Sequence, residues 1–153
     1  MKKYYENAEG QLFVDPILAN HVGLTEITQD QFSQIIADRN KPTTDQLLQR
    51  LTQARKEQET QGVTINGIRY AGDPGNRQAL QEAIAFMDDA GLTEFPGWKD
   101  SDNKFHVNHP LADVVDAYRA VGMRRVALIA AEGEYAAQIT AGTLTDLSEV
   151  VWP

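Results

Sequence analysis

The feature that most constrains the fold is an Asn-Gly pair in the middle of the chain. Asn66 and Gly67 stand between two short β-prone runs, 63–65 and 68–70. A two-residue type I′ turn needs a positive φ at both central positions, and Asn followed by Gly tolerates this best. The sequence therefore predicts a β-hairpin over residues 63–70.

A helix is predicted directly after this hairpin. The turn-forming stretch 72–75 stops the second strand, and either Asp73 or Asn76 can cap the helix that follows. Apolar residues then recur at helical spacing until Gly91, which can end the helix. They are Ala79, Leu80, Ala83, Ile84 and Met87. Phe95 and Trp98 come next, and we expect both aromatic rings in the core.

A strand and a long helix are predicted in the C-terminal third. Residues 104–108 alternate like a strand, and Asn108 can cap a helix that begins around Pro110. Apolar residues keep the helical period from Leu111 onwards, and Gly133 is predicted to break or bend this helix. The expected structural core of this part of the chain is Leu80, Ile84, Trp98, Val114 and Tyr118.

The N-terminal part combines a hairpin with a short helix. Two apolar runs, Tyr4-Tyr5 and residues 12–14, flank a polar loop and predict two paired strands. Thr28, followed three residues later by Gln31, matches a capping box at the start of a helix. This helix should end before Pro42, because the residue that precedes a proline avoids the helical region.

Residues 43–61 are predicted to form a helix that connects two parts of the chain. A narrow stripe that begins at Leu47 and ends at Ala54 is apolar, and the stretch 55–61 is wholly polar, as in a solvated helix end or a linker. The stripe either packs on the chain's own core or supports a homo-oligomer. The predicted fold class is α+β. It has a β-rich N-terminal part (1–42), a connecting helix (43–61) and a C-terminal domain (62–153) of hairpin, helix, strand and helix.

The composition argues against several classes of protein. The 153 residues carry a formal net charge of −8, which disfavours contact with the phosphate backbone of nucleic acids. No apolar run approaches the length of about 18 residues that a membrane span needs. The chain has no cysteine, which excludes disulfides and thiolate chemistry and fits an intracellular protein. We expect neither a nucleic-acid partner nor a membrane partner.

The residues that could carry chemistry form no organised set. His106 and His109 have i, i+3 spacing, but a strand end and a proline intervene, so we expect the two imidazoles to face different ways as solvated turn and cap residues. Asp100 and Asp102 could serve a small polysaccharide-cleaving enzyme, yet nothing in the sequence pairs them. Nucleophile-elbow, zinc-protease and Walker motifs are absent. The sequence predicts no metal, no cofactor and no catalytic activity.

Aromatic and apolar residues near the N-terminus are the candidate partner-binding residues. A small hairpin cannot bury all of them alone, so they either dock on the rest of the chain or form a protein interface. These residues are Tyr4, Tyr5, Leu12, Phe13 and Val14. Trp152, next to the C-terminus, likewise either docks on the rest of the chain or forms a protein interface. The edge strands of the hairpin could also pair with strands of a partner.

Two regions of the sequence resemble a known family. The stretch 62–98, with Asn66-Gly67, the turn 73–76, an alanine-rich helix and Trp98, is similar to an uncharacterised domain often found in tail-fibre and tail-assembly proteins of tailed phages and prophages. A strand and a long helix from residue 103 to about residue 139 complete the resemblance. The N-terminal part, with its tyrosines and the stretch 24–31, resembles the start of tail fibre assembly proteins.

This resemblance implies a function without catalysis. The chain is short, lacks a fibrous repeat and is taken as complete from Met1, so we expect a separate assembly protein rather than a domain fused to a fibre. The resemblance then implies a chaperone that binds the distal, C-terminal tip of a trimeric tail fibre in the host bacterial cytoplasm. The alternative is a structural tail-tip component that stays on the particle and contacts the host cell surface.

Overall fold

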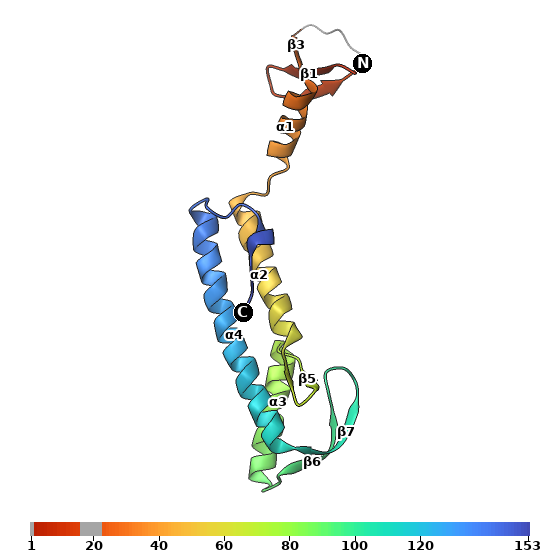
Figure 1. Cartoon of the computed structure of the whole chain (residues 1–153), viewed down its shortest axis with the longest axis vertical. Helices are drawn as coiled ribbons and strands as arrows, with labels where there is room; N and C mark the ends of the chain where they lie inside the picture. Colours follow the sequence, from red (N-terminus) through yellow and green to blue (C-terminus); the bar gives the residue numbers. More distant parts are fainter. Residues whose placement is uncertain (1, 16–22) are drawn as a thin grey trace. The chain divides into compact units, whose positions relative to one another are not determined.

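The computed structural model describes residues 2–15 and 23–153 and has the predicted α+β class. The chain divides into two compact units, Met1–Thr43 and Thr44–Pro153. Each unit has its own secondary structure, and each is described separately below (Figure 1). None of the helices in the described ranges is long and apolar enough to cross a membrane.

The first unit is a three-stranded antiparallel sheet followed by one helix. The strands β1 (Tyr4–Asn7), β2 (Leu12–Val14) and β3 (Leu24–Ile27) have the order β2-β1-β3. Tyr5 of β1 lies opposite Phe13 of β2 and Glu26 of β3. The predicted hairpin is confirmed, and β3 is a strand that the sequence analysis did not identify.

The helix of the first unit, α1 (Gln29–Arg39), starts at the predicted capping box. The Thr28 hydroxyl accepts from the N–H of Gln31 at 3.1 Å, and the Gln31 side chain accepts from the N–H of Thr28 at 2.8 Å. The helix ends at Arg39, with Asn40 as its C-cap, and thus before Pro42, as predicted. It contains no buried residue among those described, and its Phe32 ring lies 4.7 Å from the ring of Tyr4.

The second unit is built along one long helix, α4 (Leu111–Thr140). The helix α2 (Thr44–Gln61) runs beside the C-terminal half of α4, and α3 (Pro74–Asp89) runs beside its N-terminal half (Figure 1). Two hairpins lie at the α3 end of the unit: β4 (Val63–Ile65) with β5 (Ile68–Tyr70), and β6 (Glu94–Lys99) with β7 (Phe105–Pro110).

The α2–α4 pair has its own core. Leu47 and Leu51 of α2 pack with Ile139 of α4 and with Leu144, and Trp152 docks on this cluster beside Tyr135. A short 3₁₀ helix, η1 (Leu147–Glu149), leads the chain back toward the cluster. The helix placed between two domains in the sequence analysis is therefore part of the second unit, because its leucine stripe is buried against α4.

The other half of α4 forms a second core with α3 and the β4–β5 hairpin. Tyr70, Leu80, Val114 and Ala117 are buried there. Around them pack half-buried side chains, which include the remaining predicted core residues Ile84, Trp98 and Tyr118.

Local backbone signals in this unit behave as predicted, with two exceptions in α4. Asn66 and Gly67 have φ values of 49° and 79°, as a type I′ turn requires, and Asp73 caps α3. Gly133 does not interrupt α4, which was a wrong prediction: packing against α2 outweighs the modest cost of a glycine inside a helix. Asn108 does not cap α4 either, because the helix begins after Pro110.

Candidate polypeptide-binding site

The predicted partner-binding residues fall into two groups in the first unit. Tyr4 and Tyr5 lie on β1, which is the central strand, so their backbone already pairs on both sides. Leu12, Phe13 and Val14 lie on β2, which within the described residues pairs only with β1. The outer edges of β2 and β3 are therefore the places where this sheet could accept another strand.

Tyr5 belongs to the interior of the first unit. Its side chain is buried, Leu12 and Phe13 are half-buried, and Val14 is exposed. Tyr4 is half-buried and packs against Phe32 of α1. Among the described residues of this unit, the outer edge of β2 pairs with no other strand.

The two histidines lie side by side in the second unit, contrary to the prediction that they face different ways. Their ring centroids are 5.9 Å apart. Asn108 has a φ of 50°, which breaks the alternation of β7 and brings His106 and His109 to the same face. The partner strand follows the same spacing, because Phe95 lies opposite His109 and Trp98 lies opposite His106.

Both histidines have hydrogen-bond partners in the protein. His109 Nε2 lies 2.7 Å from the Tyr70 hydroxyl in the buried core, and His106 Nε2 lies 2.8 Å from Asp100 Oδ2. Burial lowers the pKa of His109, so its neutral form is favoured. Burial also raises the pKa of Tyr70 to about 12. These two rings therefore form a neutral hydrogen-bonded pair.

Asp100 and Asp102 hold the β6–β7 loop. Asp100 accepts from the backbone N–H groups of Asp102 and Lys104, both at 2.9 Å. The hydrogen bond from His106, followed by that from Lys104, lowers the pKa of Asp100. Asp102 forms an ion pair with Arg69 at 2.8 Å. In this arrangement the two carboxylates stabilise a turn and point to different partners.

A buried carboxylate at the end of α2 joins the three helices of the second unit. Glu59 is 7% exposed and forms ion pairs with Arg55 of its own helix, with Arg77 of α3 at 3.3 Å and with Arg125 of α4 at 3.5 Å. Arg55 also reaches Glu132 of α4 at 2.5 Å. The stretch 55–61 was predicted to be a solvated helix end or a linker. It instead contributes to an ionic junction inside the second unit.

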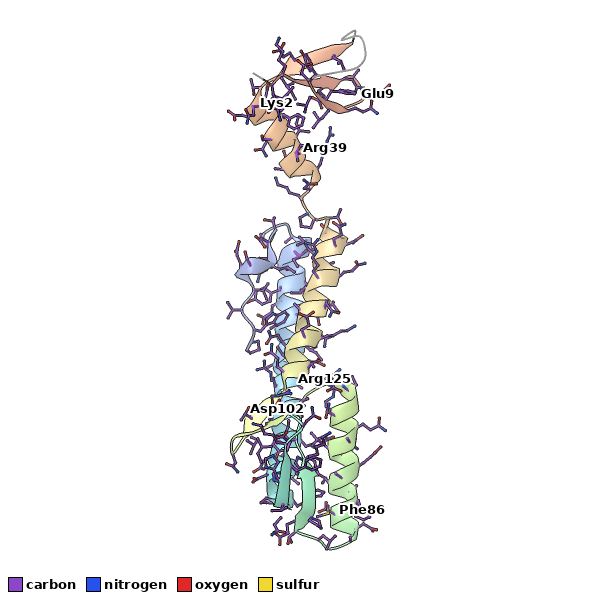
Figure 2. All side chains as sticks on the ribbon, turned by 90° about the vertical axis from the view of Figure 1, so that its right-hand side faces the viewer. Lys2, Glu9, Arg39, Phe86, Asp102 and Arg125 are labelled. Carbon is purple, nitrogen blue, oxygen red and sulfur yellow. The ribbon has the colours of Figure 1, made fainter. Side chains whose placement is uncertain are left out.

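A groove opens beside this junction, between α3 and α4. Its volume is about 990 Å³. Three arginines line it, Arg77, Arg119 and Arg125, together with Tyr118, Gly122 and Met123. Figure 2 places Arg125 where α2 ends and α3 begins, with Phe86 toward the other end of α3. The groove thus combines apolar surface with arginine side chains that are paired with Glu59 and Asp116.

The exposed face of α4 continues the apolar part of the groove. Met123, Val126 and Ile129, one every three residues, are 70%, 62% and 41% exposed. A sequence signal for this strip was available, because these residues lie outside the helical face that Val114 and Leu128 bury. The groove itself depends on side chains from α3 and α4, which are far apart in the sequence.

Residues 42–151 match a protein family described as Domain of unknown function (DUF4376). The chain belongs to this family. The family region covers the second unit almost from end to end and contains the groove, the ionic junction and the histidine pair. No curated protein and no solved structure matches the chain.

No group of three or more His, Asp or Glu side chains suited to a metal ion occurs within residues 2–15 and 23–153. The described residues offer two strand edges in the first unit, and a groove lined by three arginines beside an exposed apolar strip in the family region.

Proposed function

We propose that this chain is a phage tail fibre assembly protein that binds the C-terminal tip of a trimeric fibre and assists its assembly without catalysis. The observation that carries the proposal is the exposed apolar strip on α4, formed by Met123, Val126 and Ile129. Exposed apolar patches of this kind typically mark contact sites for another macromolecule. We take the fibre as the partner because residues 24–31 and 62–98 resemble tail-assembly proteins.

The histidine and aspartate contacts support a binding role over an enzymatic one. Asp100 is engaged by two backbone N–H groups and by His106, and His109 is engaged by Tyr70. These interactions stabilise the hairpin. A chaperone of this kind would act in the bacterial cytoplasm during assembly, where it would cover apolar fibre surface until the trimer closes.

Co-expression with the C-terminal segment of a trimeric tail fibre protein tests the proposal. We expect soluble, trimeric fibre to form in higher yield with this chain than without it. Val126→Asp should remove the gain, because a carboxylate on the strip cannot be buried against an apolar partner surface. Val151→Asp is the matched control, since Val151 is 76% exposed and lies outside the strip. Equal yields with and without the chain would contradict the proposal.

Mass spectrometry of purified particles separates the transient chaperone from the retained component. A chaperone should be absent from mature particles, whereas a structural tail-tip component should be present in a fixed ratio to the fibre.

A further inference from the structure

The helix α4 has a second apolar face in addition to the one that it buries. Five residues, spaced alternately by three and four positions, lie on the side opposite the buried Val121 and Leu128, and all five are exposed. We call them the outer face of α4: Met123, Val126, Ala130, Gly133 and Ala137. Because α2 and α3 pack on the buried side, the outer face remains available to a partner.

The spacing of the outer face suits another helix as its partner. Apolar residues that alternate at three and four positions form a straight seam along a helix, and such a seam packs against a second helix at a small crossing angle. From Met123 to Ala137 the seam is about 21 Å long at the helical rise of 1.5 Å per residue. This length gives about four turns of contact between two helices.

Both glycines of α4 lie on or beside the outer face. Gly122 and Gly133 are 11 residues apart, which is about three helical turns, so they point in nearly the same direction. A Cβ atom at either position would meet nothing within 4 Å, so packing inside this chain does not require glycine there. Glycine inside a helix is less favourable than alanine. It does permit the close approach of a second backbone, as a neighbouring helix would need.

Side-chain size changes along the outer face in a way that makes the face complementary to itself. The large Met123 and Val126, which are 70% and 62% exposed, lie at its N-terminal end, and the small residues lie at its C-terminal end. In two antiparallel copies, a two-fold axis between Val126 and Ala130 places each of these residues opposite the other, and Met123 opposite Gly133. Large side chains then face small ones. Parallel copies would instead place large against large and leave a gap at the glycines.

The charged residues beside the outer face also favour the antiparallel arrangement. Arg119 lies one turn before Met123, and it contacts Asp116 at 3.5 Å. The two side chains of this pair are 73% and 64% exposed, so the pair is weak. Glu134 is exposed beside Gly133. Antiparallel copies bring Arg119 within one turn of Glu134 of the other copy, whereas parallel copies place the two Glu134 carboxylates against each other.

We infer that the outer face of α4 binds the same face of a second copy of this chain, with the two helices antiparallel. The inference goes beyond the proposed function, because it concerns the chain before it meets a fibre. In the proposed function Met123 and Val126 contact the fibre, so the fibre and the second copy compete for one surface. Pairing keeps the exposed apolar side chains covered until the fibre binds.

The mass of the full chain in solution tests whether it pairs. Sedimentation equilibrium should give a mass that rises with concentration toward twice the chain mass of 17.0 kDa, and reaches most of that value by about 100 µM. A mass that stays at 17.0 kDa over this range would overturn the inference. A trimer would overturn it as well, because an antiparallel two-fold pairing closes with two copies.

Matched glutamate substitutions test where the copies meet. Ala130→Glu should raise the Kd of the dimer at least about tenfold, because the carboxylate of each copy would lie against Val126 of the other. Ala79→Glu is the control, since it makes the same change at an exposed position of α3 that does not line the groove. It should change the Kd less than about twofold. Circular dichroism verifies that both variants fold, and equal Kd values for the two variants would overturn the inference.

Cross-linking tests the direction of the two helices. The chain contains no cysteine, so introduced thiols are the sole reactive ones. In a mixture of Met123→Cys and Gly133→Cys chains, a short bis-maleimide should join the two different variants. Two Met123→Cys chains should cross-link poorly, because their thiols would lie about 15 Å apart along the helices. A higher yield between two Met123→Cys chains than between the two different variants would show parallel pairing and overturn the inference.

The fibre co-expression separates this inference from the proposed function. If the chain sediments as a monomer and still raises the yield of trimeric fibre, the pairing inference fails and the chaperone proposal stands. If the chain pairs as described and does not change the fibre yield, the chaperone proposal fails and the pairing stands.

Discussion

The two units of this chain differ in how much of their own surface they bury. In the first unit, Tyr5 is the buried apolar side chain of the described residues, and α1 buries none. The second unit has two cores along α4, with Leu51, Met87, Val114 and Leu128 almost fully enclosed. The packing of its own core can therefore stabilise the second unit.

This contrast suggests where a partner would contribute most. Domains of about 40 residues rarely bury enough apolar area to be stable alone without a disulfide, a metal or an oligomer. The first unit spans Met1–Thr43 and contains no cysteine. We expect it to gain stability from a strand or surface supplied by the partner, while the second unit offers a groove that is already formed.

The largest expected effect is the loss of a core side chain in the second unit. Leu128 is 0% exposed, so Leu128→Ala should lower the free energy of unfolding of this unit by about 2–5 kcal/mol. Denaturant unfolding followed by tryptophan fluorescence measures it, because Trp98 and Trp152 both lie in the second unit. Tyr5→Ala should leave this transition unchanged. A common shift in both variants would show that the two units unfold together.

The next effect concerns the ionic junction of the second unit. Glu59→Gln should cost about 3 kcal/mol, because three guanidinium groups would lose their shared buried counter-charge. The same substitution at Glu57, which is exposed on the same helix, should cost less than about 0.5 kcal/mol. Matching urea midpoints for the two variants would mean that the junction does not stabilise the unit.

A smaller effect tests the first unit. Thr28→Ala removes the capping-box acceptor and should destabilise α1 by about 1 kcal/mol. Amide exchange in α1 should become faster, while the tryptophan-detected transition of the second unit stays the same. Ser33→Ala, at an exposed position of the same helix, is the control. Slower exchange in Thr28→Ala than in the control would contradict the assignment of the cap.

The smallest effect is a pH dependence of the stability of the second unit. The pKa of His109 in the folded chain lies below its ordinary value. Below about pH 6.5 the unfolded chain therefore binds a proton at His109 more readily than the folded chain does. Stability should therefore fall as the pH drops through this range, and His109→Gln should flatten that limb. Because the pKa of Tyr70 is raised to about 12, stability should also fall above about pH 10.

The sequence predicts this fold best where the signal is local. The Thr28–Gln31 capping box, the Asn66-Gly67 turn and the Asp73 cap each depend on residues within one turn of the chain, and all three occur as expected. The helix over 29–39 and the hairpin at 63–70 follow from them.

Features that depend on distant residues escaped prediction. Glu59 is buried because Arg77 and Arg125 reach it from two other helices, and no periodicity within 55–61 indicates this. The histidine pair faces one way because of the positive φ at Asn108, a backbone state that alternation rules do not include. Likewise, the groove exists only once α3 lies against α4.

The central claim is that this chain acts by binding another polypeptide. The second unit offers a groove that is already formed, and the first unit offers strand edges that the partner completes. Hydrogen exchange of the chain alone and with the trimeric fibre tip tests it most directly. The account predicts strong protection around Leu128 in both samples, and new protection with the fibre at residues 118–125 and in β2 or β3. Unchanged exchange at all of these positions in the presence of the fibre would contradict it.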